Sequence, residues 1–387
     1  MPFSTLRSLV AGVALSAPLG TQAASPAPSA SPAAAPAPPA KAAQPSQPEA
    51  DEPLASGEGR EVAQKLADQL VSAFVFHDQA EAYAAMLRRN AAEGRYDKGT
   101  RGALASVMTD DLMAVHKDGH LHVMLAPPPD ARGGDGGHGA PTGMPPAIQA
   151  AKTIAPGIGY IRFTAFFGSD EEVAAVRAWL AENVNDRVLI FDLRNHHGGG
   201  LAEQDAIFSY LYAARTPLVK MAISKDVYDN VGSPMKAGPT LVFAAEGDKM
   251  VATHSAVPGE PTPLRKAKVY LLISNKTASA AEHFSLALKS TGRATLIGEP
   301  TAGANHFGGG MDLTDHFGVW MPVGRTYDIK TGKDWEGAGI APDIAVDPKD
   351  ALVVALEKAG LNHAEAVKLD AQEVPAEPIH SDKLSAR

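Results

Sequence analysis

The sequence contains no cysteine, which excludes disulfide bonds, thiolate metal sites, a cysteine nucleophile and a lipid-modified N-terminal cysteine. It also has no run of basic residues, and its formal net charge is -9. A nucleic-acid partner is therefore not expected, because such a partner requires Lys and Arg gathered on one face. The apolar stretch near the N-terminus is too short to span a bilayer, so no membrane span is expected either.

The first residues have the pattern of an export signal. Arg7 supplies a positive charge, an apolar stretch follows it, and the small residues near Ala23 are typical of a cleavage site. We therefore expect a signal peptide over residues 1–23 and an exported protein, either periplasmic or secreted. Residues 24–56 are mostly Ala, Pro and Ser, a composition that cannot form a core and that predicts a disordered tether.

The remaining residues predict two ordered regions separated by a loop. Apolar residues at helical spacing indicate a small N-terminal helical domain over residues 57–128. Residues 129–155 are rich in Gly and Pro, which predicts a long loop. Residues 156–350 alternate strands with helices, the pattern of an α/β domain whose sheet is largely covered. A C-terminal helix and a polar tail are expected over residues 351–387.

Ser279 lies where a predicted strand passes into a predicted helix, in the segment NKTASAAEHF. A serine at the mouth of a helix can act as a nucleophile, because the unpaired amides of the first turn can stabilise a developing oxyanion. Ser279 and Glu282 also have the spacing of a helix capping box, which requires no catalytic function. The spacing alone favours the cap.

A second motif, FDLRNHHGGG, ends a predicted buried strand with Gly198, Gly199 and Gly200. Such a segment can offer free backbone amides at the place where α/β folds bind ligands, beyond the carboxyl ends of the strands. A glycine triplet by itself also fits a flexible turn, so this motif alone is weak evidence for a ligand site.

Four motifs in this order, FDLRNHHGGG, NKTASAAEHF, GEPTAG and WEGAGIAPDIAVDP, resemble the core of one serine peptidase family. That family includes the C-terminal processing (tail-specific) proteases, the tricorn protease core and the repeats of interphotoreceptor retinoid-binding protein. The resemblance implies an α/β fold with a crotonase-like (ClpP/crotonase) ββα core and makes Ser279 the nucleophile. It also implies an oxyanion hole formed by the amides of Ala280 and Gly198, with Gly199 as the neighbouring option.

The general base is harder to assign. Members of the family that use a Ser-Lys dyad carry a lysine directly after the glycine of G-x-x-T-x-G, whereas Ala304 follows Gly303 here. In the branch that resembles the tricorn and retinoid-binding proteins, a histidine near the end of the helical region faces the nucleophile, and HKDGHLHV matches that motif. We therefore assign His120 as the base and keep His122 as its main rival.

The same branch supplies an acidic residue that orients the base or holds the substrate, and Glu336 in WEGAGIAPDI matches it. Gly119 stands where tricorn-like enzymes have a hydroxyl residue, so Asp118 is the expected substitute as a partner of His120. Lys276 lies three residues before Ser279 and could serve as a base if it were buried, although a solvated lysine is the ordinary interpretation.

Two other functions fit parts of the sequence. His120 and His122 could complete a zinc site with His196 and His197, although the sequence fixes no distance between the two pairs. The fold could also carry an apolar ligand without catalysis. The coincidence of Ser279, the glycine motif and the histidine favours an exported serine peptidase, a hydrolase that acts on a peptide or protein and requires no metal or other cofactor.

Overall fold

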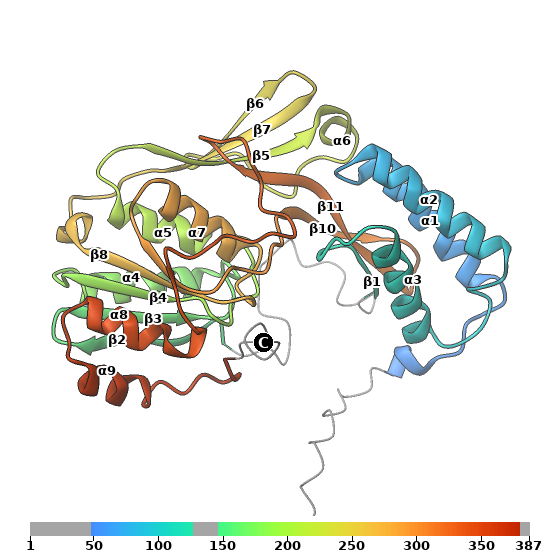
Figure 1. Ribbon diagram of the computed structural model, residues 1–387. Helices are drawn as coiled ribbons and strands as arrows, with labels where there is room; N and C mark the ends of the chain where they lie inside the picture. Colours follow the sequence, from blue (N-terminus) through green and yellow to red (C-terminus); the bar gives the residue numbers. More distant parts are fainter. Residues whose placement is uncertain (1–47, 127–145, 380–387) are drawn as a thin grey trace, which may run out of the picture. The chain divides into compact units, whose positions relative to one another are not determined.

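The computed structural model describes residues 48–126 and 146–379 (Figure 1). These residues belong to one compact unit. The predicted signal peptide, most of the predicted tether and most of the predicted Gly/Pro-rich loop lie outside the described residues. Within the described ranges, no helix is long and apolar enough to cross a membrane.

A six-stranded sheet forms the centre of the α/β region. Five neighbouring strands are parallel, and the sixth, at one edge, is antiparallel. The parallel strands are nearly continuous apolar runs, as expected for a sheet buried on both faces. In spatial order the strands are β12 (Ile344–Ala345), β9 (Thr295–Gly298), β8 (Lys268–Ile273), β4 (Val188–Asp192), β3 (Ile158–Phe163) and β2 (Ile148–Ala155).

Helices cover both faces of this sheet, because successive strand residues point to opposite sides. Phe191 and Leu271 pack on the helices of one face, whereas Ile190 and Leu272 pack on those of the other. This arrangement confirms the predicted covered α/β sheet (Figure 1). The first face carries α4 (Asp170–Glu182), α5 (Ala202–Leu211) and α7 (Ala280–Ser290), and the second carries α8 (Ala351–Lys358) and α9 (His363–Asp370).

Two boundary predictions are wrong. The end of the predicted tether over residues 24–56 is ordered, because Pro48–Asp51 form a 3-10 helix and Pro53 pairs with Thr100. Residues Ile148–Ala155, assigned to the end of the loop over residues 129–155, form strand β2 and pair with β3. The strand lies at the edge of the sheet, so most of its residues are only half-buried or exposed. Polar residues such as Lys152 are tolerated there, and they conceal the alternation that would have predicted a strand.

A second sheet is antiparallel and supports the N-terminal helices. These predicted helices are confirmed, but they share their core with this sheet and do not close a core of their own. The strands are β1 (His122–Leu125), β11 (Phe317–Asp328), β5 (Thr216–Ser224), β7 (Lys249–Ala256), β6 (Leu241–Glu246) and β10 (His306–Asp312), which also pairs with β11. The helices are α1 (Glu58–Ala73), α2 (His77–Ala92) and α3 (Arg101–Val115), and α6 (Lys225–Asn230) follows β5.

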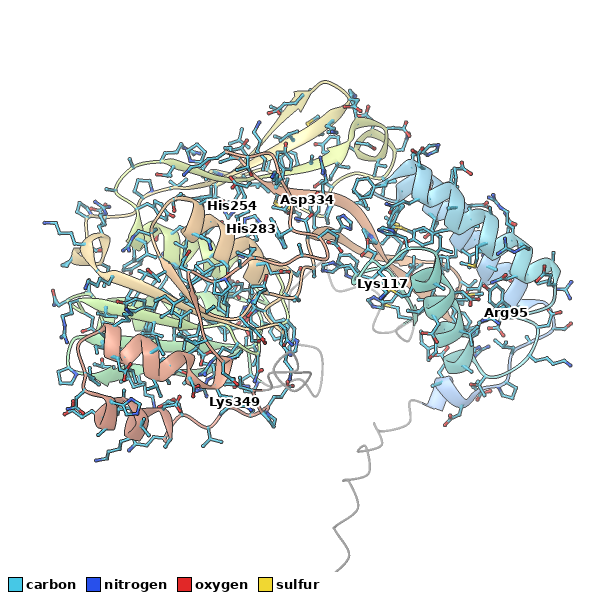
Figure 2. The ribbon with its side chains drawn as sticks, viewed as in Figure 1. Arg95, Lys117, His254, His283, Asp334 and Lys349 are labelled. Atoms are coloured by element: carbon cyan, nitrogen blue, oxygen red, sulfur yellow. The ribbon has the colours of Figure 1, made fainter. Side chains whose placement is uncertain are left out.

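The second sheet also packs against helices of the first. His254 on β7 lies beside His283 on α7, with His254 Nδ1 and His283 Nε2 2.7 Å apart (Figure 2). Both rings are buried. The segment that follows Ser279 in the chain is therefore held between the two sheets.

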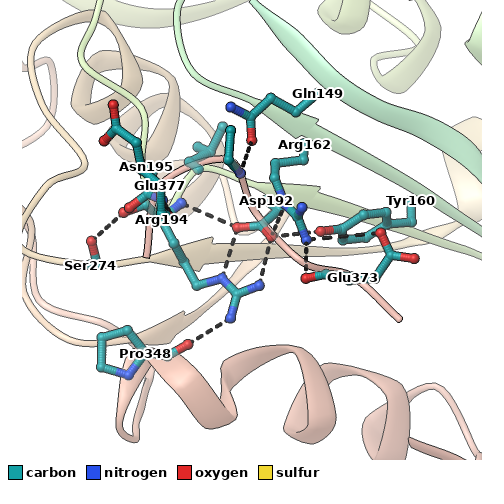
Figure 3. A network of polar contacts seen from close by, with 12 residues as sticks. Gln149, Tyr160, Arg162, Asp192, Arg194, Asn195, Ser274, Pro348, Glu373 and Glu377 are labelled. Carbon is teal, nitrogen blue, oxygen red and sulfur yellow. Dashed lines mark hydrogen bonds and ion pairs between the residues drawn. The ribbon is translucent and has the colours of Figure 1, made fainter. Parts of the chain in front are cut away.

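A buried ionic network anchors the end of β4, directly before the glycine motif (Figure 3). Asp192 accepts hydrogen bonds from the Tyr160 hydroxyl (2.7 Å), from Arg162 (3.1 Å) and from Arg194 (2.7 and 2.9 Å). Arg194 also donates to the carbonyl oxygen of Pro348 (2.8 Å). Burial acts to raise the pKa of Asp192, but the two guanidinium groups outweigh it and hold that pKa well below its usual range.

We expect Asp192→Asn to lower the free energy of unfolding by about 3–5 kcal/mol, because two buried guanidinium groups lose their counter-charge. The folded-state pKa is depressed, so the wild type keeps this stability above the ordinary Asp pKa and loses it only as the pH falls toward the folded value. Urea unfolding at neutral and acid pH measures both effects. Asp97→Asn, at an exposed pair with Arg60, is the matched control with a much smaller effect, and equal losses in the two variants would contradict the prediction.

Candidate active site

Ser279 occupies a sharp turn between β8 and α7. Its φ of 54° and ψ of -119° make it the one non-glycine residue with positive φ in the described ranges. Such a conformation costs on the order of 1–3 kcal/mol and persists only where the surrounding structure imposes it. A strained serine between a strand and a helix is the arrangement that presents a nucleophilic hydroxyl at the end of a sheet.

Ser279 and Glu282 occupy the predicted capping-box positions at the start of α7, but within the described residues no hydrogen bond to the Ser279 hydroxyl is present there. The amide of Glu282 instead donates to the main-chain carbonyl oxygen of Ser279 (2.8 Å). The Glu282 carboxylate accepts the Ser279 amide (2.9 Å). Glu282 thus supplies its part of the predicted box, whereas the serine hydroxyl is not consumed by the helix terminus.

Glu282 also ties α7 to the segment that leads into β10. Its buried carboxylate accepts hydrogen bonds from the Thr301 hydroxyl (2.6 Å) and from the amides of Gly303 and Ala304 (2.8 Å each). Burial raises the pKa of Glu282, and these hydrogen bonds oppose that rise. Since β10 begins at His306, Glu282 fixes the start of that strand relative to Ser279.

The glycine motif lies directly against Ser279. A Cβ on Gly198 would lie 2.7 Å from the Ser279 Cβ, and one on Gly199 would lie 2.0 Å from the carbonyl oxygen of Phe166. The φ values of the two glycines are 112° and 127°, which other residues rarely adopt. Close approach and backbone conformation therefore both require glycine at these two positions.

The amides beside Ser279 differ in what they bind. The Gly198 amide donates to Nδ1 of His196 (3.0 Å). Within the described part of the chain, the amides of Gly199 and Ala280 have no acceptor. These two amides, one from the glycine motif and one from the first turn of α7, are therefore available to an anionic ligand, whereas the Gly198 amide is already engaged.

A cavity of about 810 Å³ opens beside these groups. Ser279, Gly199, Ala280 and His306 all line it. Side chains of the second sheet and of the loops around it form much of the remaining wall, including Met221, Leu241, Phe307, Trp320 and Trp335. A peptide segment could therefore reach Ser279 along a largely apolar surface.

Two histidines, His306 and His283, line this cavity together with Ser279, and His306 is the one that is bound to a buried carboxylate. Its Nδ1 lies 2.7 Å from Oδ2 of Asp118, and both side chains are buried. Its Nε2 is buried without a hydrogen-bond partner among the described residues. Burial alone would lower the pKa of His306, but the hydrogen bond and the charge of Asp118 raise it above the ordinary value.

Glu336 holds the main chain at the start of β10. Its Oε2 accepts hydrogen bonds from the amides of Asn305 (2.6 Å) and His306 (3.3 Å) and lies 3.8 Å from His306 Nδ1. Burial raises the pKa of the Glu336 carboxyl, and the charge of His306 opposes that rise. Glu336 therefore contacts the segment that carries His306 and has no contact with His120.

His120 is placed differently from the prediction. Its ring stacks on Trp320, with centroids 4.8 Å apart, and burial lowers its pKa to about 4. Trp320 lines the cavity that contains Ser279, whereas His120 does not. Asp118 accepts the main-chain amide of His120 (2.9 Å) through one oxygen and binds His306 through the other. The expected acidic partner is thus present, but its side-chain partner is His306.

The rival base and the proposed zinc ligands are also accounted for. His122 is exposed, and its Nδ1 lies 2.8 Å from the carbonyl oxygen of His120. The four histidines predicted as a zinc site form no group with metal-binding spacing in the described ranges. Such a group is formed there by Asp118, His306 and Glu336, whose ligand atoms lie within 4.8 Å of one another.

One feature of the sequence distinguishes His306 from the other histidines. His306 follows Gly303 by three residues, in the segment where the Ser-Lys members of the family have their lysine. His306 lies two residues after the position of that lysine, so its side chain reaches the site only if the main chain of this segment follows a different path. Main-chain amides of this segment donate hydrogen bonds to the carboxylates of Glu282 and Glu336, and these bonds help to define its path.

The fold and the site place the chain among serine hydrolases built on a covered α/β sheet. Within that class, residues 157–346 match peptidase family S41.

Similar proteins support this match over part of their length. A chloroplastic C-terminal processing peptidase of Tetradesmus obliquus is 30% identical over 206 residues, which are 52% of this chain and 38% of that protein. A carboxyl-terminal-processing protease of Picosynechococcus is 28% identical over 190 residues, 49% of this chain and 39% of that protein. The chain thus spans about two-fifths of these relatives. The crystal structure of a putative peptidase from Parabacteroides merdae shares the fold, with a TM-score of 0.53 at 17% identity over 79% of this chain and 97% of that one.

Proposed function

We propose that this protein is a serine peptidase in which Ser279 attacks the carbonyl carbon of a peptide bond. The observation that carries the proposal is the placement of Ser279 and His306 in one cavity, with Nδ1 of His306 bound to Asp118. A histidine fixed by a carboxylate through Nδ1 leaves Nε2 to exchange a proton with a serine hydroxyl. The match to peptidase family S41 and the relatives' names support the same activity.

In this mechanism His306, rather than His120, is the general base. His306 Nε2 takes the proton from the Ser279 hydroxyl as Oγ forms a bond to the substrate carbon. The amides of Gly199 and Ala280 hold the resulting oxyanion. The carbon-nitrogen bond then breaks as His306 returns the proton to the leaving amine. A water molecule hydrolyses the acyl-enzyme by the same two proton transfers in reverse order.

Asp118 and Glu336 act as positioning residues in the proposal. Asp118 fixes the tautomer of His306 and stabilises the imidazolium that forms, as the acidic member of a triad does. Glu336 holds the amides of Asn305 and His306, which keeps the base in register with Ser279. His120 remains the alternative base, and its low pKa and its stacking on Trp320 count against it.

The finer features of the sequence prediction belong to the same proposal. The parallel sheet with α7 following Ser279 is consistent with a crotonase-like core, and the N-terminal pattern in the sequence supports export to the periplasm or outside the cell. The substrate is a peptide or protein, and the similarity to C-terminal processing proteases favours tail-specific processing. A carrier of an apolar ligand is the alternative if no activated serine exists.

Labelling with a fluorophosphonate probe tests the proposal and separates the two candidate bases. The wild type is expected to label, His306→Ala is expected to label at least about 100-fold more slowly because general-base assistance is lost, and His120→Ala is expected to label within a few-fold of wild type. Slow labelling of His120→Ala with normal labelling of His306→Ala would reverse the assignment of the base. A folded wild type that does not label would overturn the peptidase and favour the carrier.

A further inference from the structure

A second group of hydrogen-bonded polar side chains, in which His254 and His283 are buried and Asp205 is partly exposed, reaches the cavity from the side of the second sheet. Nε2 of His254 lies 2.8 Å from an oxygen of Asp205, and Nδ1 of the same ring lies 2.7 Å from Nε2 of His283 (Figure 2). The other oxygen of Asp205 accepts the Thr240 hydroxyl (2.8 Å). The proposed mechanism uses none of these groups, although Asp205 and His283 both line the cavity.

The last member of this hydrogen-bonded group, His283, lies close to the nucleophile. His283 lies one turn along α7 from Ser279, and its amide donates to the Ser279 carbonyl oxygen (3.0 Å). Only 3% of the surface of His283 is exposed. Its Nδ1 makes no hydrogen bond within the described residues and is not fully buried. Nδ1 is therefore the ring nitrogen that His283 presents to the cavity.

The hydrogen bonds limit which atoms donate. A carboxylate only accepts, so His254 Nε2 must donate to Asp205. If the proton between the two rings belongs to Nε2 of His283, Nδ1 of His254 is its acceptor. Burial holds the pKa of His283 well below its ordinary value, so this ring is neutral, and with its proton on Nε2 its Nδ1 is an acceptor. The polar end of the cavity thus presents a carboxylate and a ring nitrogen, both of which accept hydrogen bonds.

The walls beside these acceptors are apolar. Met221 and Leu241 belong to one hydrophobic cluster with Met235 packed against it, and all three line the cavity. Lys236 is the one lysine among the residues that line it, and its side chain is exposed. Apolar walls that lead to acceptors match a side chain with an aliphatic stem and a cationic tip, such as Lys or Arg.

We propose that Asp205 and His283 form the end of a substrate side-chain pocket and that the peptidase prefers Lys or Arg at the residue whose carbonyl Ser279 attacks. The inference rests on the proposed function. The cationic tip donates to the free lone pairs of Asp205 and to His283 Nδ1, while the stem lies along Met221 and Leu241. His254 and Thr240 position Asp205 through their hydrogen bonds to its two oxygens.

A set of fluorogenic peptides that differ only at this position tests the proposal. For the wild type we expect kcat/KM to be higher with Lys or Arg than with Leu or Ala. Asp205→Asn keeps the shape of the side chain and removes its charge, so the ratio of kcat/KM for Lys over Leu is expected to fall at least ~30-fold. Asp229→Asn, at an exposed carboxylate on α6 outside the cavity, removes the same charge and is expected to leave the ratio unchanged.

The outcomes separate this inference from the proposed function. A wild type that labels with fluorophosphonate and cleaves peptides, but prefers Leu or Ala, overturns the inference alone. A preference for Lys that survives in Asp205→Asn also overturns it, because the carboxylate would then not be the receptor. If neither labelling nor cleavage occurs, the proposed function itself fails. The wild-type peptide series decides the question even if Asp205→Asn does not fold.

Discussion

Ser279→Ala is expected to lower kcat by about 10⁵–10⁶-fold and to abolish fluorophosphonate labelling, because the group that forms the covalent intermediate is removed. The fold is expected to be unaffected, since Ser279 is half-buried and its hydroxyl supports no capping hydrogen bond. Peptide hydrolysis and thermal unfolding of the same preparations measure the two effects. Ser290→Ala, at the far end of α7, is the matched control and should label normally.

The strained backbone of Ser279 leads to a second prediction, which concerns stability. Alanine retains a Cβ at a φ of 54°, so Ser279→Ala should keep the strain. Ser279→Gly should be equally inactive but more stable than Ser279→Ala by about 1 kcal/mol, because glycine adopts positive φ without steric cost. Activity within tenfold of wild type in Ser279→Ala would refute Ser279 as the nucleophile. Equal stability of the two variants would refute the strain.

Asp118→Asn is expected to lower kcat/KM by about 10⁴-fold, because the carboxylate that fixes the His306 tautomer is lost. The pH profile should also change. Only neutral His306 can accept the proton, so wild-type activity rises as the pH passes the His306 pKa, which Asp118 holds above its ordinary value. Removing the charge lowers that pKa and shifts the rising limb of kcat/KM toward acid. Residual activity measured across pH values follows this shift.

The stability profile provides an independent check on the same pair. The folded-state pKa of His306 is raised, so its contribution to stability is complete below the ordinary His pKa of about 6.5 and is lost as the pH rises through the folded value. Asp118→Asn should remove this dependence. Asp110→Asn, an exposed carboxylate on α3, should change neither profile. A loss of activity in Asp118→Asn without a shift of the limb would reduce Asp118 to a structural role.

Local patterns explain why much of the fold was predictable. The strands that lead to Asp192 and Ser274 are short apolar runs, and helix α4 begins with a capping box of Ser169 and Glu172, a signal that neighbouring residues encode. Strand β2 was missed because an edge strand tolerates polar residues. The helices before His120 were predicted, but their packing on β11 was not, since that core joins residues far apart in the chain.

The candidate site divides in the same way. The sequence by itself placed Ser279 at a strand-to-helix turn and the glycines after a buried strand, because adjacent residues encode both features. The resemblance to a peptidase family, and not the spacing, made Ser279 the predicted nucleophile. Only the tertiary structure brought Asp118 to His306, which lie 188 positions apart. It also joined Asp205 and His283 through hydrogen bonds to His254. It also directed the Gly198 amide to His196 and left those of Gly199 and Ala280 available. Histidines are frequent enough here that spacing could not choose among them, whereas burial and a carboxylate within hydrogen-bonding distance could.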